Sequence, residues 1–138
     1  MKKLICILFV IVLSFMLSCY PALENLKSKM IDKYTNDKNY VTLSGEIIES
    51  NDDYVEIKCE ELTNYINCTK ENCHYYIYSE QTIELSVGDQ IEFITVPFHF
   101  YDGQKLPIVE LKKGGKTLLS FEEGKKNLIN WVNQLQGK

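Results

Sequence analysis

The chain has 138 residues, of which 45% are hydrophobic and 25% are charged, a composition typical of a folded protein and not of a disordered one. It has 15 lysines, 19 acidic residues and no arginine, and its net charge at pH 7 is −4. This acidic balance argues against nucleic-acid binding, which depends on neutralising phosphates, and the lack of arginine removes bidentate phosphate clamps.

The first 18 residues have the layout of a signal peptide. A basic start, MKK, precedes an uncharged run of 14 residues from Leu4 to Leu17. A membrane-spanning helix needs about 20 apolar residues, whereas the apolar region of a secretory signal needs about 7–15. The run therefore predicts export. Ordinary signal peptidase requires small side chains one and three residues before its cut, and neither a cut after Ser18 nor one after Cys19 provides both.

Residues 16–19, MLSC, resemble a bacterial lipobox, in which a leucine, a small residue and then Gly, Ala or Ser precede a cysteine. Ser18 and Cys19 match this pattern, and Met16 and Leu17 depart from it. The resemblance implies attachment of diacylglycerol to Cys19, cleavage between Ser18 and Cys19, and acylation of the new amino terminus. Two or three acyl chains hold a protein stably on a membrane. The alternatives are a soluble secreted protein and one anchored by an intact helix.

Cleavage at this point predicts a mature chain of residues 19–138, a length that suits one domain. Its net charge is about −6, because 13 lysines remain against 19 acidic residues. We expect three parts: a signal peptide at 1–18, a lipid-anchored N-terminus with an amphipathic helix at 19–39, and a β-rich domain with a C-terminal helix at 40–138.

Residues 21–34 predict a helix, because apolar side chains recur there at spacings of three and four. The apolar positions are Leu23, Leu26, Met30 and Tyr34. The turn-forming sequence TNDKN at 35–39 ends this pattern.

From Tyr40 to about Phe121 the apolar and polar residues alternate with the period of β-strands. The alternating segments are VTLSGEII at 41–48, YVEIKC at 54–59, HYYIYS at 74–79 and QIEFITV at 90–96. Turn sequences separate the strands: SNDD at 50–53, VGD at 87–89, DG at 102–103 and KKGGK at 112–116. Because no long helical pattern lies between the strands, the sheet should be mainly antiparallel.

The sequence SFEEGKKNLINWVNQL at 120–135 predicts a second helix. Ser120 and Glu123 fit the S-x-x-E capping box that marks a helix start. Gly124 inside such a helix costs about 1 kcal/mol. The apolar residues that share one face are Phe121, Leu128, Val132 and Leu135, with Ile129 beside them.

The glycine in LSGEII and the turn in SVGDQIEF are similar to features of small OB-fold barrels found in bacterial lipoproteins, over about residues 40–111. We therefore predict an α+β fold, a small antiparallel β-sheet or OB-like barrel flanked by an N-terminal and a C-terminal helix. The resemblance implies a binding role, since OB folds bind oligonucleotides and oligosaccharides. The acidic charge argues against the oligonucleotide.

Three cysteines and a histidine follow the predicted anchor: Cys59, Cys68, Cys73 and His74. A disulfide between Cys68 and Cys73 suits an exported protein and would stabilise it by about 2 kcal/mol. A zinc site would use all four residues. Structural zinc sites usually have a tight C-x2-4-C pair, and only the gap between Cys68 and Cys73 comes near this spacing. The adjacent Cys73 and His74 would point to opposite faces of a strand. We therefore predict no metal site. Two further possibilities remain open for the cysteines: a disulfide that includes Cys59, or free thiols. A metal-binding or enzymatic module using these four residues is the alternative function.

Catalytic motifs are absent from the sequence, which has no G-x-S-x-G, H-E-x-x-H or P-loop. A nucleophile at Cys73 would need His74 or His99 as its base, and nothing in the sequence brings these residues together. We therefore predict a protein that is not an enzyme and has no cofactor.

Aromatic residues supply the candidate ligand surface. In HYYIYS, Tyr75 and Ile77 lie on the opposite strand face from Tyr76 and Tyr78. In VPFHFYDG, Phe98 and Phe100 lie on the opposite face from His99 and Tyr101. One face of each segment must enter the core, and the other can contact a protein or a sugar. The residues of this possible ligand surface are Tyr76, Tyr78, His99 and Tyr101.

Together these patterns predict a lipid-anchored protein on the extracytoplasmic face of the cell membrane, or of the outer membrane in a Gram-negative source. Its domain is expected to bind an envelope protein or a saccharide without catalysis.

Overall fold

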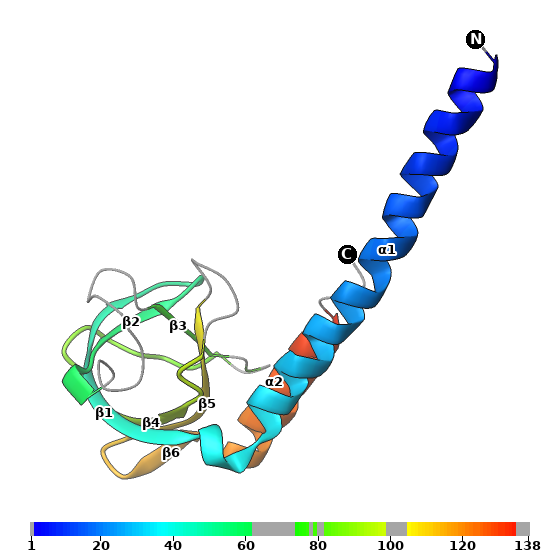
Figure 1. Ribbon diagram of the computed structural model, residues 1–138. Coiled ribbons are helices and arrows are strands. Elements are labelled where there is room, and N and C mark those ends of the chain that lie inside the picture. The colour runs from blue at the N-terminus through cyan, green and yellow to red at the C-terminus, as the bar shows by residue number, and fades with distance from the viewer. Residues whose placement is uncertain (1, 62–73, 78, 80–81, 99–104, 135–138) are drawn as a thin grey trace.

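The computed structural model describes residues 2–61, 74–77, 79, 82–98 and 105–134. Its elements are helix α1 (Lys2–Thr35), the short 3-10 helix η1 (Asp37–Asn39), strands β1 (Val41–Ser50), β2 (Val55–Lys58), β3 (His74–Ile77), β4 (Gln90–Thr95), β5 (Leu106–Lys113) and β6 (Lys116–Leu119), and helix α2 (Phe121–Gln134). The strands form a barrel with α2 against it, and α1 runs past α2 and away from the domain (Figure 1). The predicted α+β fold, an OB-like barrel flanked by two helices, is confirmed.

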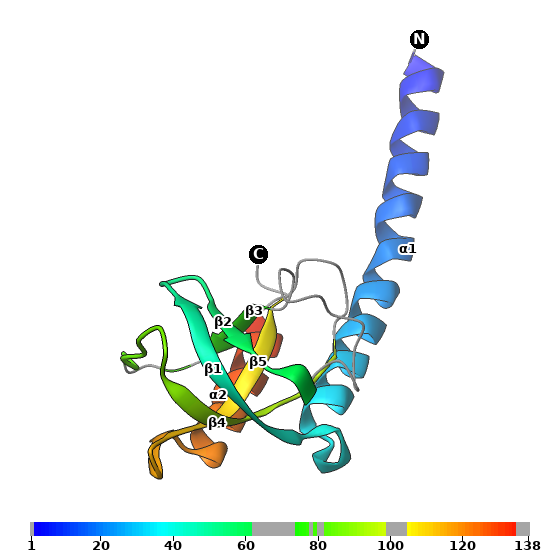
Figure 2. The same cartoon turned by 90° about the vertical axis from the view of Figure 1, so that its left-hand side faces the viewer.

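Five strands close the barrel in the order β3-β2-β1-β4-β5, because β3 pairs with β5 as well as with β2 (Figure 2). The β3–β5 pairing is parallel, with Tyr75 opposite Leu106 and Ile77 opposite Ile108. The remaining pairings among the described strands are antiparallel. The prediction of a mainly antiparallel sheet is confirmed, and the parallel contact that closes it is a feature that the strand pattern did not reveal.

Strand β1 is long enough to serve two neighbours. Its first part, from Val41 to Glu46, pairs with β4, and its second part, from Glu46 to Ser50, pairs with β2. Gly45 lies where these parts meet, and a Cβ atom there would lie 2.8 Å from the carbonyl oxygen of Lys58. The missing side chain therefore lets β1 and β2 approach closely as the sheet curves into a barrel.

Two of the predicted glycine turns are present. In KKGGK, Gly114 and Gly115 have φ angles of 57° and 77°, the positive values that a two-residue hairpin requires at both central positions. In VGD, Gly88 has a φ angle of 93°, and its amide donates to the carbonyl of Ile47 at 2.8 Å. This second turn is thus fastened to β1. The predicted DG turn at 102–103 lies outside the described residues.

Two hydrophobic cores lie on opposite sides of β5. The barrel interior holds Leu43, Ile47, Val55, Ile57, Tyr75, Ile91, Phe93, Leu106, Ile108, Leu111 and Leu119. The space between the barrel and the helices holds Met30, Tyr34, Val96, Val109, Leu128 and Val132. Because β5 is buried on both faces, its sequence LPIV is apolar without interruption.

Helix α1 joins two segments that the sequence patterns separate, the apolar run near the N-terminus and the amphipathic stretch at 21–34, into one helix of 34 residues. Met30 and Tyr34 are buried at 5% and 0% exposure, whereas Leu26, on the same predicted stripe, is 44% exposed. The domain therefore holds only the end of α1. Within the described residues, no helix has both the length and the apolar run needed to cross a membrane.

The C-terminal end of α1 is capped by the segment that leads into β1. A helix leaves its last carbonyl groups without intrahelical partners. Here four successive carbonyls, from Ile31 to Tyr34, accept hydrogen bonds from the Thr35 hydroxyl (2.7 Å), the Asn36 amide (3.2 Å), the Asn39 side chain (2.9 Å) and the Tyr40 hydroxyl. Burial and the Asp37 carboxylate raise the pKa of Tyr40 to about 12, so this hydroxyl remains a donor at neutral pH.

Helix α2 begins as predicted and lies directly on the backbone of β5. The Glu123 amide donates to the Ser120 hydroxyl oxygen at 3.4 Å, as in a capping box. A Cβ atom on Gly124 would overlap the carbonyl oxygen of Val109 and lie 2.6 Å from its carbonyl carbon. Close approach to β5 therefore explains a glycine that weakens the helix locally. Leu135, predicted on the apolar face, lies outside the described residues.

Replacement of Gly124 by alanine tests this contact. Gly124→Ala should destabilise the domain by about 1–3 kcal/mol, the usual cost of overpacking, although alanine favours a helix by about 1 kcal/mol. Urea unfolding measures the change, and Asn130→Ala, at an exposed position of α2, is the matched control. If Gly124→Ala were as stable as the control variant, the close approach of α2 to β5 would be wrong.

Acidification tests the turn before β4. The Lys113 ammonium at 2.7 Å and the Ser86 amide at 2.8 Å both donate to the Asp89 carboxylate and hold its pKa below the ordinary value. A lowered folded-state pKa stabilises the protein above the unfolded-state pKa, and this contribution is lost as pH falls through the folded-state pKa. Asp89→Asn should therefore show a smaller fall in Tm than the wild type below about pH 4. An unchanged slope, or an equal effect of Asp53→Asn, would contradict this role.

Candidate functional site

A pocket of about 270 Å³ opens beside the β1–β2 hairpin. Among the described residues, strands β2 and β3 pair through Val55 opposite Tyr75 and Glu56 opposite His74, and beyond Tyr75 strand β3 continues alongside β5. The hairpin and the end of β3 therefore separate. The pocket is lined by residues 50–55 of the hairpin, residues 75–77 of β3, and Ser79, Thr82, Ile83 and Leu85.

The hairpin wall of the pocket is held in shape by Asn51. Its side-chain oxygen accepts hydrogen bonds from the amides of Asp53 (2.9 Å) and Tyr54 (3.0 Å), the geometry for which Asn is favoured in turns. The Asn51 amide donates to the Tyr54 carbonyl at 3.1 Å, and the Asn51 side-chain amide donates to Glu49 at 3.2 Å. The sequence SNDD is therefore a structured turn that presents its two aspartates.

Tyr54 ties the outer side of the hairpin to β3. Its hydroxyl donates to the Glu49 carboxylate at 2.8 Å, and this hydrogen bond raises the pKa of Tyr54. Its ring stacks on His74, with centroids 3.9 Å apart and ring planes 18° apart. The Nε2 atom of His74 also lies 3.9 Å from a carboxylate oxygen of Glu56. These side chains brace the hairpin against β3, so the pocket wall does not depend on the hairpin alone.

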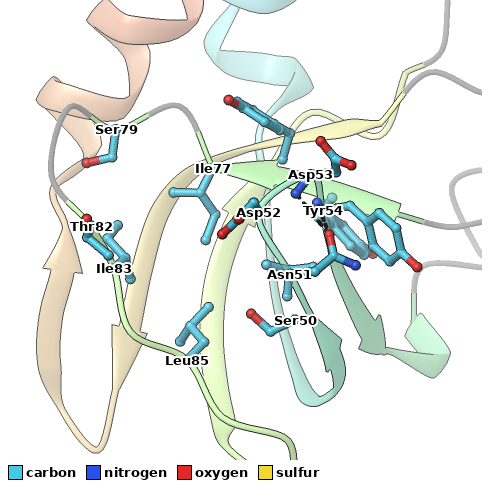
Figure 3. A pocket seen from close by; sticks show the side chains of 13 residues that line it. Ser50, Asn51, Asp52, Asp53, Tyr54, Ile77, Ser79, Thr82, Ile83 and Leu85 are labelled. Atoms are coloured by element: carbon cyan, nitrogen blue, oxygen red, sulfur yellow. Dashed lines mark hydrogen bonds between the residues drawn. The ribbon is translucent and has the colours of Figure 1, made fainter.

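The opposite wall of the pocket is apolar with two hydroxyl groups. Ile77, Ile83 and Leu85 pack against the barrel core and face the pocket from the other side. Figure 3 shows Ser50 and Asp52 pointing from the hairpin toward this wall, whereas the carboxylate of Asp53 points away. Ser79 and Thr82 add hydroxyl groups to the same wall. The pocket thus combines an acidic hairpin with an apolar surface, an arrangement suited to binding.

Tyr75 and Tyr76 point to opposite sides of β3, as predicted. Tyr75 is fully buried in the barrel, edge-on to Phe93 with ring centroids 5.2 Å apart. Burial, and then Cys59, raise the pKa of Tyr75, and its hydroxyl has no hydrogen-bond partner among the described residues. Tyr76 is half-buried, lines the pocket and has the ammonium of Lys105 5.7 Å from its ring centroid. Both tyrosines are in the pocket lining, and Tyr76 is the more exposed of the two.

The structure places part of the predicted ligand surface. Tyr76 lies in the pocket lining, and Tyr78, His99 and Tyr101 lie outside the described residues. Sequence patterns did not identify the hairpin and residues 82–85 as walls of a site. The alternation in TIEL, where Ile83 and Leu85 both face inward, was the available signal for the second wall.

The predicted cysteine cluster is only partly within the described residues. Cys59 is half-buried against the barrel core and His74 stacks on Tyr54, and the predicted disulfide partners Cys68 and Cys73 lie outside the described residues. Across the described ranges, no group of three or more His, Cys, Asp or Glu residues is arranged to hold a metal ion. Cys19 belongs to α1, and the structure describes its backbone alone.

A second hollow of about 350 Å³ lies beside the end of α1. Several of its lining groups already form the joint between α1 and β1. Asn36 accepts from the Lys38 amide at 3.1 Å, Asn39 donates to the Lys33 carbonyl, and the Lys33 ammonium lies 4.9 Å from the centroid of Phe98. This hollow is larger than the hairpin pocket, but Lys33, Asn36 and Asn39 in its lining are engaged in the joint, so we take the hairpin pocket as the candidate site.

Comparison with known proteins adds no relative: no family model, no curated protein and no solved structure matches the chain.

The hairpin wall should depend on the side-chain oxygen of Asn51. Asn51→Ala removes the acceptor for two amides and should reduce stability by about 1 kcal/mol, the usual net worth of such hydrogen bonds. It should also speed hydrogen exchange at the amides of Asp53 and Tyr54, which NMR measures. Asn51→Ser keeps a side-chain oxygen acceptor without adding a charge beside Glu49, and is the matched control. Equal exchange rates in wild type and Asn51→Ala would mean that the turn does not need this side chain.

Proposed function

We propose that the protein is a lipoprotein anchored by acyl chains on Cys19, with the barrel held on the extracytoplasmic side of a membrane as a non-enzymatic binding module. The observation that carries this proposal is the division of α1 into an exposed apolar part and a buried part. Its apolar N-terminal side chains are exposed, with Leu8 at 66% and Phe9 at 69%, whereas burial begins at Met30. An apolar surface of this extent is typical of a segment that inserts into a membrane or is removed.

Pro21 supports processing near Cys19. In a helix from Lys2 to Thr35, Pro21 is an interior residue, where its missing N–H and its ring cost about 3 kcal/mol. After cleavage before Cys19, Pro21 would lie in the first turn, where backbone N–H groups have no intrahelical partner in any case. The processed chain therefore has a better helix than the precursor.

Residues between the anchor and the domain would act as a spacer. Met30, the first buried residue among the described side chains of α1, is 11 positions beyond Cys19, and at 1.5 Å per residue this gives about 16 Å of helix. Cleavage before Cys19 would leave Met30 and Tyr34 in their core. The proposed anchor thus holds the domain near the membrane surface without altering its packing.

The binding role rests on the hairpin pocket, because its lining retains polar groups, Asp52 above all, that the described fold does not use. An OB-like barrel that presents a pocket next to the turn between β1 and β2 suits an oligosaccharide or a protein segment. The proposed partners are accordingly a saccharide or a protein of the cell envelope. The acidic hairpin, with Asp52 and Asp53 in its turn, is unsuited to nucleic acid.

Intact mass of the protein from detergent-solubilised membranes of a bacterial host tests the anchor. The wild type should start at Cys19 and carry two or three acyl chains, because the lipobox-like sequence directs lipid to that thiol. Cys19→Ala should abolish both the lipid and this start site.

Cys6→Ala is the matched control, because Cys6 is also in the apolar run but would be removed with the signal peptide. Its product should have the same mass as the wild-type product. A wild-type mass without lipid, or one that retains Met1, would overturn the lipoprotein proposal and favour a secreted or helix-anchored protein.

A further inference from the structure

We propose that the hairpin pocket binds a sugar ring that carries an amino group, with Asp52 as the residue that contacts the amine. This inference rests on the proposed binding role and names the chemical class of its ligand. It concerns the pocket between the β1–β2 hairpin and the wall formed by Ile77, Ile83 and Leu85 (Figure 3).

Charge determines the first property of the ligand. Among the described residues that line the pocket there are two carboxylates, Asp52 and Asp53, and no lysine or histidine. Lys105, near Tyr76, contacts that ring and is not part of the lining. An anionic ligand would face like charge with no cation to pair with it, so the pocket favours a neutral or cationic ligand.

Direction distinguishes the two aspartates. In Figure 3 the Asp52 carboxylate points across the pocket toward Ile77 and Thr82, and the Asp53 carboxylate points out of it. In the described part of the chain no hydrogen bond or ion pair engages the Asp52 side chain, whereas Glu49 and Asp89 are both bound by donors. Asp52 is thus an exposed acceptor that a ligand in the pocket can reach, and charge-assisted hydrogen bonds from an ammonium group are the strongest that it can form.

The other lining groups favour a sugar ring over a simple amine. Ser50, Ser79 and Thr82 also line the pocket, and a hydroxyl group can both donate to and accept from ligand hydroxyls. Ile83 and Leu85 offer an apolar surface for the C–H face of a ring. The volume, about 270 Å³, lies just below the range of about 300–1,000 Å³ for drug-sized ligands, so one ring fits and a long segment does not.

Isothermal titration of the full-length protein in detergent with three trisaccharides tests the proposal. The probes are trimers of glucosamine, of N-acetylglucosamine and of galacturonic acid, at a pH of about 6 where the amines are protonated. Glucosamine should bind about tenfold tighter than N-acetylglucosamine, the value of one charge-assisted hydrogen bond, and galacturonic acid should bind weakest. Tightest binding of galacturonic acid, or no binding of any trimer, would overturn the proposal.

Two variants then test the role of Asp52. Asp52→Asn should abolish the tenfold preference for glucosamine over N-acetylglucosamine. Glu84→Gln removes the same charge from an exposed side chain that lies between Ile83 and Leu85 in the sequence but does not line the pocket, and should retain the preference. Equal losses in both variants would reduce the effect to net charge and overturn the assignment to Asp52. The mass of each preparation reports the lipid anchor separately, so a failure of the ligand class does not count against the anchor.

Discussion

The close approach of Gly124 to the backbone of Val109 sets the position of α2, and the position of α1 follows from it. Any side chain at 124 would collide with β5. Leu128 and Val132, about one and two turns further along α2, reach the second core only because the helix lies so near the strand. Met30 and Tyr34 pack into that same core. The direction in which α1 leaves the domain therefore depends on the contact between Gly124 and Val109, although no residue of α1 takes part in that contact.

The pocket is a consequence of how the barrel closes. Strand β3 is shared between β2 and β5, but its contact with β2 ends at Tyr75, and Ile77 pairs only with Ile108 of β5 among the described strands. The β1–β2 hairpin therefore separates from the end of β3, and Asn51 holds the turn of this hairpin through hydrogen bonds from the amides of Asp53 and Tyr54. The parallel pairing of β3 with β5 therefore has two results: it closes the barrel, and it leaves a pocket beside the β1–β2 hairpin.

The sequence predicted the elements of this fold better than its closure or its site. Alternation of apolar residues, the glycines of KKGGK and VGD, and the Ser120 cap are local signals, and the structure confirms each of them. The parallel β3–β5 contact depends on residues about 30 positions apart, and no local pattern encodes that pairing. The pocket was missed for the same reason, since its walls at 50–54 and 82–85 become neighbours only through the barrel. Alternation separates Tyr76 from Tyr75 but does not say which of the two faces enters the core, so the ligand role of Tyr76 stays a prediction.

The joint between α1 and β1 connects the proposed anchor to the proposed site. Four carbonyls at the end of α1 are all bound by the segment from Thr35 to Tyr40, and Tyr40 packs edge-on against Phe121 of α2 with centroids 5.2 Å apart. A flexible tether would let the barrel turn freely above the membrane, whereas this joint transmits the direction of α1 to β1. Strand β1 starts next to the end of α1 and ends at Ser50, and Asp52 lies in the turn that follows it. The orientation of the pocket relative to a lipid-anchored Cys19 would then be a property of the fold, not of the length of a linker.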